Sequence, residues 1–146
     1  KSFKGLYGVK AVLNDVDFTR SKLHGMTLKE IVGRGIILRG AFASGGVVTN
    51  SILDGADMHS FWAPGMIWED VSLRGADVTN INAAGSVFRG VDLTNVVGLD
   101  AKHTNLEGVT FEDCRLPEGF EYDGLKLVSP KSDNEQAGLP EGDKTS

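Results

Sequence analysis

Two five-residue words stand back to back in the middle of the chain, Val71-Ser72-Leu73-Arg74-Gly75 and Ala76-Asp77-Val78-Thr79-Asn80. Each word reads as an apolar residue, a polar residue, a second apolar residue, a polar residue, and then Gly or Asn. The same word fits the chain in steps of five from Ala11 to Asp100. A short fixed period dictates an architecture before any single residue does.

The five positions of the word, which we call slots one to five, have different compositions. Slots one and three are almost wholly apolar or small, and slot five is mostly Gly, Asn, Asp or Ser. This period matches neither a helix, at about 3.6 residues, nor an alternating strand, at about two. It matches two inward residues separated by one outward residue and followed by a tight corner. Such a unit cannot bury its own apolar side, so successive coils must stack around a shared interior.

The words Leu53-Asp54-Gly55-Ala56-Asp57, Leu73-Arg74-Gly75-Ala76-Asp77 and Thr104-Asn105-Leu106-Glu107-Gly108 resemble the pentapeptide repeat family. The resemblance covers about residues 11–118. It implies an all-β fold, a right-handed quadrilateral parallel β-helix (a solenoid) of about five coils. With four words in each coil, it also implies that residues 20 apart stack on one another.

The phase of the repeat breaks once, within residues 98–103. Leu93 and Leu106 both occupy slot three, but they are 13 residues apart, which is not a multiple of five. We therefore expect a distorted corner there. Pro117 then ends the repeats, because a ladder strand cannot easily use a residue without an N–H group.

The segments outside the repeats are predicted to cap the solenoid. Residues 1–10 fit the word only loosely and are interpreted as an N-terminal cap, and residues 119–128 as a C-terminal cap that covers the last edge. Residues 129–146 are a polar tail with the composition of a flexible segment. Such a tail takes a fixed position mainly where something holds it, so docking on a partner and an incidental contact both remain open.

Length and composition limit the classes of protein. A chain of 146 residues suits one domain, and 15 basic against 20 acidic residues argue against general nucleic-acid binding. One cysteine excludes an internal disulfide, and no apolar run approaches the roughly 18 residues that span a membrane. The chain does not begin with Met, which leaves open a removed targeting peptide or a trimmed chain.

The sequence predicts no catalytic site, no metal site and no cofactor. His24, His59 and His103 share no metal-ligand spacing with one another or with Cys114. Asp57 and His59 project from one side of a strand, as an acid–base pair would, but no nucleophile or cleft accompanies them. Cys114 occupies slot one and is expected to be an inert core residue.

An acidic column offers an alternative function. Asp17, Asp57 and Asp77 share an outward column, and some members of the pentapeptide repeat family that protect DNA gyrase resemble duplex DNA in shape and charge. A DNA-mimic regulator of a topoisomerase or gyrase is therefore the alternative hypothesis. Ile37 interrupts the column and Arg39 and His59 lie beside it, so the charge is far from a continuous stripe.

The clearer departure from the repeat is apolar. Slot two faces solvent in this fold, yet here it holds aromatic and branched apolar residues in ordered columns. Isolated valines suit strand surfaces and need no explanation, but contiguous exposed apolar surface marks binding interfaces, and Trp is a favoured anchor. The predicted partner-binding residues are Phe42 and Trp62 in one column, Val47, Ile67 and Val87 in a second, and Val32 and Ile52 in a third.

These observations favour a non-catalytic structural or scaffolding protein that binds a protein partner as a subunit of a larger complex. The resemblance to single-domain members of cyanobacteria and the chloroplast thylakoid lumen suggests a soluble protein of a photosynthetic membrane complex. That setting rests on family analogy alone.

Overall fold

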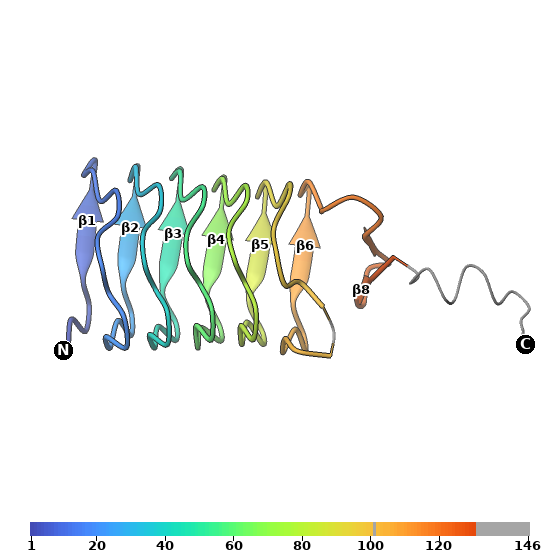
Figure 1. The fold of residues 1–146 in the computed structure, drawn as a ribbon, viewed down its shortest axis with the longest axis horizontal. Helices are drawn as coiled ribbons and strands as arrows, with labels where there is room; N and C mark the ends of the chain where they lie inside the picture. The colour runs from blue at the N-terminus through green and yellow to red at the C-terminus, as the bar shows by residue number, and fades with distance from the viewer. Residues whose placement is uncertain (101, 131–146) are drawn as a thin grey trace, which may run out of the picture.

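The computed structural model describes residues 1–100 and 102–130, and within them the fold is all-β with no helix. One short strand from each coil joins a six-stranded parallel sheet in the order β1-β2-β3-β4-β5-β6 (Figure 1). An antiparallel hairpin of two further strands follows the last coil. The strands are β1 Tyr7–Val9, β2 Thr27–Lys29, β3 Val47–Thr49, β4 Ile67–Glu69, β5 Val87–Arg89, β6 Thr110–Glu112, β7 Glu121–Tyr122 and β8 Leu127–Val128.

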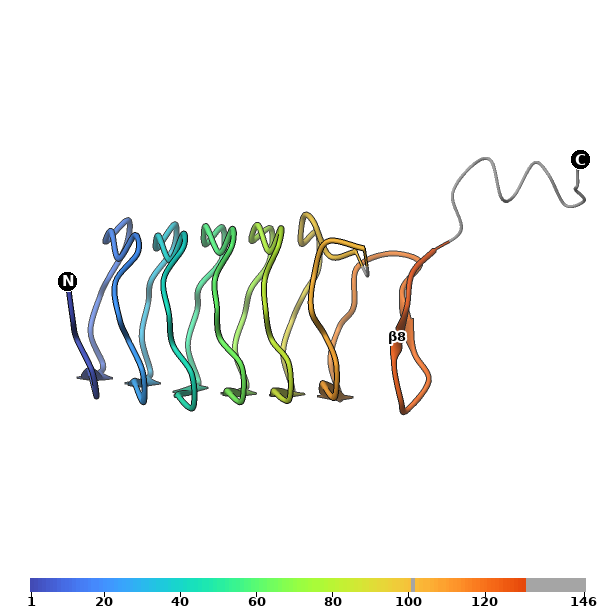
Figure 2. The ribbon, with the colours of Figure 1, turned by 90° about the horizontal axis from the view of Figure 1, so that it is seen from below.

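The coils stack into a β-solenoid of about five turns with four sides, as the repeat predicted. Each β-strand pairs with the strand one coil later, so Val47 lies against Ile67 and Ile67 against Val87. The other three sides carry single parallel bridges between slot-two residues 20 apart, such as Phe42 with Trp62 and Asp57 with Asp77. Figure 2 shows the same coils seen from below, stacked along one axis.

We name the four faces in chain order by their slot-two columns. The aromatic face carries Ser2, Lys22, Phe42, Trp62, Asn82 and Asn105. The sheet face carries Tyr7, Thr27, Val47, Ile67, Val87 and Thr110. The valine face carries Val12, Val32, Ile52, Ser72, Asp92 and Arg115, and the aspartate face carries Asp17, Ile37, Asp57, Asp77 and Val97.

The interior is filled by slots one and three, all of which are buried from Ser21 to Leu93. An aromatic ladder runs through its C-terminal half. The rings of Trp68 and Phe88 stack at 5.8 Å, and those of Phe88 and Phe111 at 5.3 Å. The 20-residue register places these rings above one another, and their close packing replaces contacts with water.

Slot five forms the corners, where the backbone enters the left-handed region. Gly65 has a φ of 66° and Gly75 a φ of 68°, but Asn80, at 59°, shows that other residues are also held there. Glycine pays no steric cost for this conformation, and Asn and Asp pay less than most residues. The composition of slot five follows from this requirement.

The register changes once, between the fifth coil and β6. Val97 still lies 20 residues beyond its bridge partner Asp77, whereas Asn105 lies 23 residues beyond Asn82. Three extra residues therefore lie between Val97 and Asn105, where the spacing of Leu93 and Leu106 predicts a break. The backbone N–H groups of His103 and Thr104 donate to the Asp100 carbonyl, which closes this corner.

The N-terminal end differs from the prediction. Ser2 bridges Lys22 and β1 pairs with β2, so the ladder begins about ten residues before the predicted start at Ala11. Residues 1–10 supply two words of the first coil rather than a separate cap. Gly8 hides their fit because it leaves slot three empty above Leu28, whose side chain comes within 3.3 Å of where a Cβ would stand.

At the other end the β7–β8 hairpin lies beyond the last coil (Figure 2). Tyr122 packs edge-on against Phe111 at 5.3 Å and donates its hydroxyl to the Val109 carbonyl at 3.4 Å. The hairpin thus continues the aromatic ladder outside the repeats. Of the predicted tail, residues 131–146 lie outside the described part of the chain.

Candidate protein-interaction surface

The predicted apolar columns lie on three consecutive faces. Phe42 and Trp62 are 41% and 40% exposed on the aromatic face, and Ile67 is 42% exposed on the neighbouring sheet face. The remaining predicted residues are half-buried in the same slot, Val47 and Val87 on the sheet face and Val32 and Ile52 on the valine face. We call these seven residues the apolar band.

The aromatic face holds its two large rings against each other. The ring centroids of Phe42 and Trp62 are 6.1 Å apart with an interplanar angle of 58°. His24 meets Trp62 edge-on at 6.1 Å. The Nδ1 atom of His24 accepts hydrogen bonds from the Ser44 hydroxyl at 2.8 Å and the Ser44 backbone N–H at 3.2 Å. Ser44 thus orients His24, whose ring packs against Trp62, and side chains that are ordered before binding lower its entropic cost.

Sequence reasoning missed this role of His24, which it considered as a possible metal ligand. The available signal was its spacing from Ser44, because the two residues are 20 apart in slot four and so stack on one face. The orientation of the imidazole toward Trp62, two coils away, depends on side-chain rotamers that the repeat does not specify.

Beside the apolar column, the sheet face carries a row of charges in slot four. Arg89 donates from Nε to Glu112 at 2.7 Å and from Nη1 to Glu69 at 3.3 Å. Hydrogen bonds from the guanidinium to Glu112 and Glu69, together with the charges of these two residues, raise the pKa of Arg89 above its ordinary value. These pairs border the band and are exposed, so they contribute little to stability by themselves.

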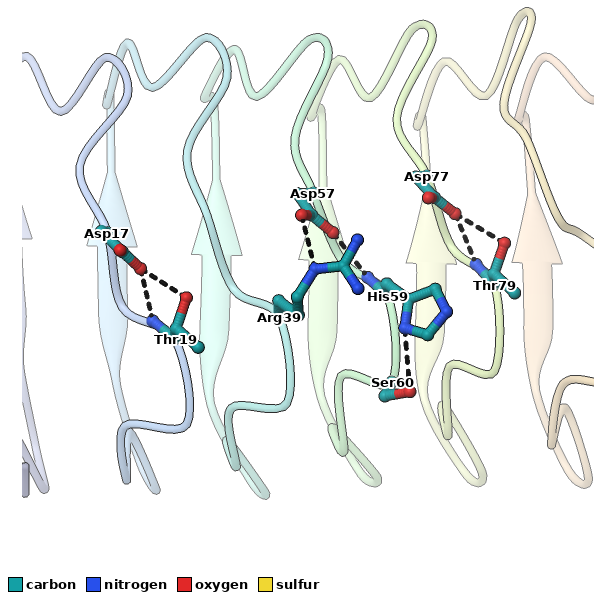
Figure 3. Close-up of polar contacts among 8 residues, drawn as sticks. All are labelled: Asp17, Thr19, Arg39, Asp57, His59, Ser60, Asp77 and Thr79. Atoms are coloured by element: carbon teal, nitrogen blue, oxygen red, sulfur yellow. Dashed lines mark hydrogen bonds and ion pairs between the residues drawn. The ribbon is translucent and has the colours of Figure 1, made fainter.

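The aspartate face is polar, and its carboxylates are engaged within the molecule (Figure 3). Asp57 accepts from the Nε of Arg39 at 2.9 Å. Asp77 accepts from the Thr79 backbone N–H at 2.9 Å and from its hydroxyl at 2.6 Å. Burial alone would raise the pKa of Asp77, but the Thr79 hydrogen bonds and the charges of His59 and Arg39 hold it below its ordinary value.

Ile37 and Val97 flank the paired Asp57 and Asp77 in this column. Because Arg39 neutralises Asp57, the column does not form the continuous negative stripe that a DNA mimic needs.

The candidate acid–base pair is not formed in this geometry. The backbone N–H of His59 donates to Asp57 at 3.1 Å, while the Nδ1 atom of its ring lies 3.0 Å from the Ser60 hydroxyl (Figure 3). His103 forms an exposed pair with Asp100 at 2.9 Å instead. Across residues 1–100 and 102–130, no three His, Cys, Asp or Glu side chains are grouped as a metal site requires.

Cys114 faces the interior and is partly buried. Its thiol lies 3.2 Å from the Phe88 carbonyl, and burial raises its pKa above the ordinary value. A raised pKa keeps a thiol protonated and unreactive near neutral pH.

Two cavities stand out within the described residues. One is an interior void of about 20 Å³ between the last coils, lined only by apolar side chains such as Leu99 and Leu106. The other, of about 340 Å³, is an open cleft between the last coil and β8, with Glu107 and Lys126 as its charged lining groups. The described chain also contains no helix of the length and apolarity needed to cross a bilayer.

Comparison with known proteins agrees with the repeat pattern. The family model described as pentapeptide repeats (8 copies) matches residues 69–96. No curated protein sequence matches the chain significantly. The solved structure of a trypsin-treated variant of QnrB1, a plasmid-mediated fluoroquinolone resistance protein, matches with a TM-score of 0.67 and 23% identity, covering 88% of this chain. The match spans only 62% of QnrB1, so the likeness concerns the fold alone.

Two further solved structures are pentapeptide repeat proteins with lower scores. Rfr23 from the cyanobacterium Cyanothece 51142 has a TM-score of 0.40 and 19% identity, with 79% of this chain and 87% of that one covered. A protein from the Arabidopsis thaliana thylakoid lumen has a TM-score of 0.20 and 16% identity, with 95% and 70% covered. At these scores neither likeness bears on the role or location of this chain. The matched repeats of residues 69–96 and the observed solenoid make this chain similar to pentapeptide repeat proteins in both repeat and fold.

Proposed function

We propose that this protein is a non-catalytic structural subunit that binds a protein partner through the apolar band. The observation that carries the proposal is the exposed pair Phe42 and Trp62, whose rings meet on the aromatic face. Both occupy an outward slot, so the solenoid itself does not need them. Aromatic anchors of this kind supply most of the binding energy at protein interfaces.

The surroundings of the pair also support binding. His24, which is hydrogen-bonded to Ser44, packs edge-on against Trp62, and the apolar surface continues on the neighbouring face to Ile67. A preorganised aromatic centre with apolar surface beside it and charged residues at its edge has the anatomy of a protein interface. The wider setting that we propose, a complex of a photosynthetic membrane in the thylakoid lumen or its cyanobacterial equivalent, rests only on the family resemblance.

The test is co-purification with the partner from native membranes, followed by mass spectrometry. Replacing both aromatic residues, Phe42→Ser with Trp62→Ser, should abolish recovery of the partner while the β-rich circular dichroism spectrum is kept. Val97→Ser is the matched control, because Val97 is 58% exposed in the same slot but lies on the aspartate face. Unchanged recovery with the double variant would refute the proposed interface.

A further inference from the structure

The slot-two column of the sheet face reads the same in both directions over its last five strands, and Tyr7 in β1 lies outside this palindrome. From β2 to β6 it contains Thr27, Val47, Ile67, Val87 and Thr110. Ile67 stands at the centre and is the most exposed residue of the five, at 42%. With strands about 4.8 Å apart, the column is about 19 Å long. A palindromic apolar column is self-complementary when it is turned end over end.

The two ends of the same solenoid carry opposite charge. Residues 1–30 contain six basic and three acidic residues, whereas residues 91–128 contain three basic and eight acidic residues. On the sheet face this asymmetry appears in slot four, with Lys29 beside Thr27 and Glu112 beside Thr110. One oxygen of Glu112 accepts from Arg89 at 2.7 Å, which leaves its second oxygen free to accept from another cation.

We propose that the sheet face packs against the sheet face of a second copy of this chain, with a two-fold axis along β4. This inference deepens the proposed function by naming a partner for the sheet-face part of the apolar band. The axis sets Ile67 against the partner subunit's Ile67, and Val47 against the partner subunit's Val87. The ends then meet as Lys29 against the partner subunit's Glu112, in both directions, which is an isologous contact.

Charge disfavours two of the neighbouring arrangements, while the third, antiparallel with the axis between β4 and β5, would set Glu69 against the partner subunit's Arg89 and would leave Lys29 without Glu112. Two copies packed in parallel would bring Lys29 beside the partner subunit's Lys29. Antiparallel copies displaced by one coil would bring Lys29 opposite the partner subunit's Arg89. Like charges across an interface oppose association. Glu69 does face the partner subunit's Glu69 at the axis. In each chain, however, the Nη1 atom of Arg89 lies 3.3 Å from the Oε2 atom of Glu69 and supplies the opposite charge.

The arrangement keeps the aromatic face available. A two-fold axis that runs along the strands leaves the aromatic faces of both copies on the same side of the dimer. The dimer therefore presents two Phe42–Trp62 pairs side by side, which provides two anchors for one larger partner or one anchor for each of two. Because the sheet face is small, we expect association only at concentrations on the order of tens of micromolar or above.

Sedimentation velocity of the full chain across a range of concentrations tests the proposal. The natural chain should shift from monomer to dimer as concentration rises, with no larger species. Ile67→Glu should weaken association at least about a hundredfold, because two carboxylates would meet at the axis. Phe42→Ser with Trp62→Ser should still dimerise. A chain that stays monomeric throughout, or an Ile67→Glu variant that dimerises normally, would overturn the proposal without touching partner binding by the aromatic face.

Charge exchange tests the antiparallel orientation. Lys29→Glu alone and Glu112→Lys alone should each impair self-association, since each makes both ends of the dimer carry like charge. An equimolar mixture of the two variants should form heterodimers, and the double variant in one chain should dimerise again. The exchange separates lost pairing from lost folding. If the mixture remains monomeric while the natural chain dimerises, the antiparallel sheet contact is wrong.

Discussion

Trp62 and Trp68 are six residues apart and one slot apart, yet they have opposite environments. Trp62, in slot two, is 40% exposed and touches Phe42 and His24. Trp68, in slot three, is 1% exposed and stacks on Phe88 with an interplanar angle of 2°. The same side chain thus serves the core or the surface according to its slot.

The difference shows that slot three contributes to stability and that slot two is available for binding. The inner ladder of Trp68, Phe88 and Phe111 joins three coils through their interior, and its burial contributes to stability. The outer pair adds apolar area that folding leaves partly in water. Free energy that is not gained on folding can be gained on binding.

The largest expected effect comes from removing the buried side chain of Trp68. Trp68→Ala should lower the free energy of unfolding by about 3–5 kcal/mol, since it deletes a fully buried aromatic side chain and leaves a cavity between two coils. Urea denaturation followed by circular dichroism measures the loss.

Trp68→Phe is the matched control for the cavity. Within the described residues the indole Nε1 of Trp68 has no hydrogen-bond partner, so the phenyl ring removes an unsatisfied donor while keeping most of the stack. We expect it to cost less than about 1.5 kcal/mol. A larger loss with Phe than with Ala would show that ring stacking is not what holds these coils together.

The inner side of the comparison could be predicted from the sequence, and much of the outer side could not. The apolar and small residues of slots one and three predicted the core, because burial in a stacked coil admits only such residues. The position of Trp62 on an outward face followed from the same register. Its contact with His24 did not, since it depends on rotamers and on a hydrogen bond from Ser44.

The ends of the solenoid show a second limit. The first coil begins at Ser2, but Gly8 in slot three hides the repeat because a missing side chain gives no apolar signal. The palindrome of the sheet face could not be predicted from a strict 20-residue spacing either. Three extra residues before Asn105 shift the register, so that Thr110 pairs with Val87.

An intermediate effect is expected on the aspartate face, which lies opposite the sheet. Asp77→Asn should lower the free energy of unfolding at neutral pH by about 0.5–1.5 kcal/mol, because the carboxylate accepts two hydrogen bonds from Thr79. The pKa of Asp77 is held below its ordinary value of 3.8 in the folded protein. Its contribution is therefore present above about pH 4 and is lost as the pH falls through the lowered pKa.

Denaturation of the natural chain and the Asp77→Asn variant from neutral pH down to about pH 2 checks the sign, since the two curves should converge in acid. Thr79→Val, which removes the hydroxyl donor but keeps the backbone donor, should show part of the loss with the same pH dependence. A difference between Asp77 and Asn that persists unchanged in acid would mean that the charged form is not what Thr79 stabilises.

The smallest effect on stability should come from the outer tryptophan. Trp62→Ala removes the ring contacts with Phe42 and His24, and two-fifths of Trp62 is already exposed to water. We expect a loss of at most about 1 kcal/mol in the same urea titration, together with loss of the partner in co-purification. If Trp62→Ala destabilised the fold as much as Trp68→Ala, then Phe42 and Trp62 would serve mainly to stabilise the fold and not to bind a partner. A small loss of stability with a complete loss of binding would instead separate the two tryptophans by function as sharply as their slots separate them by position.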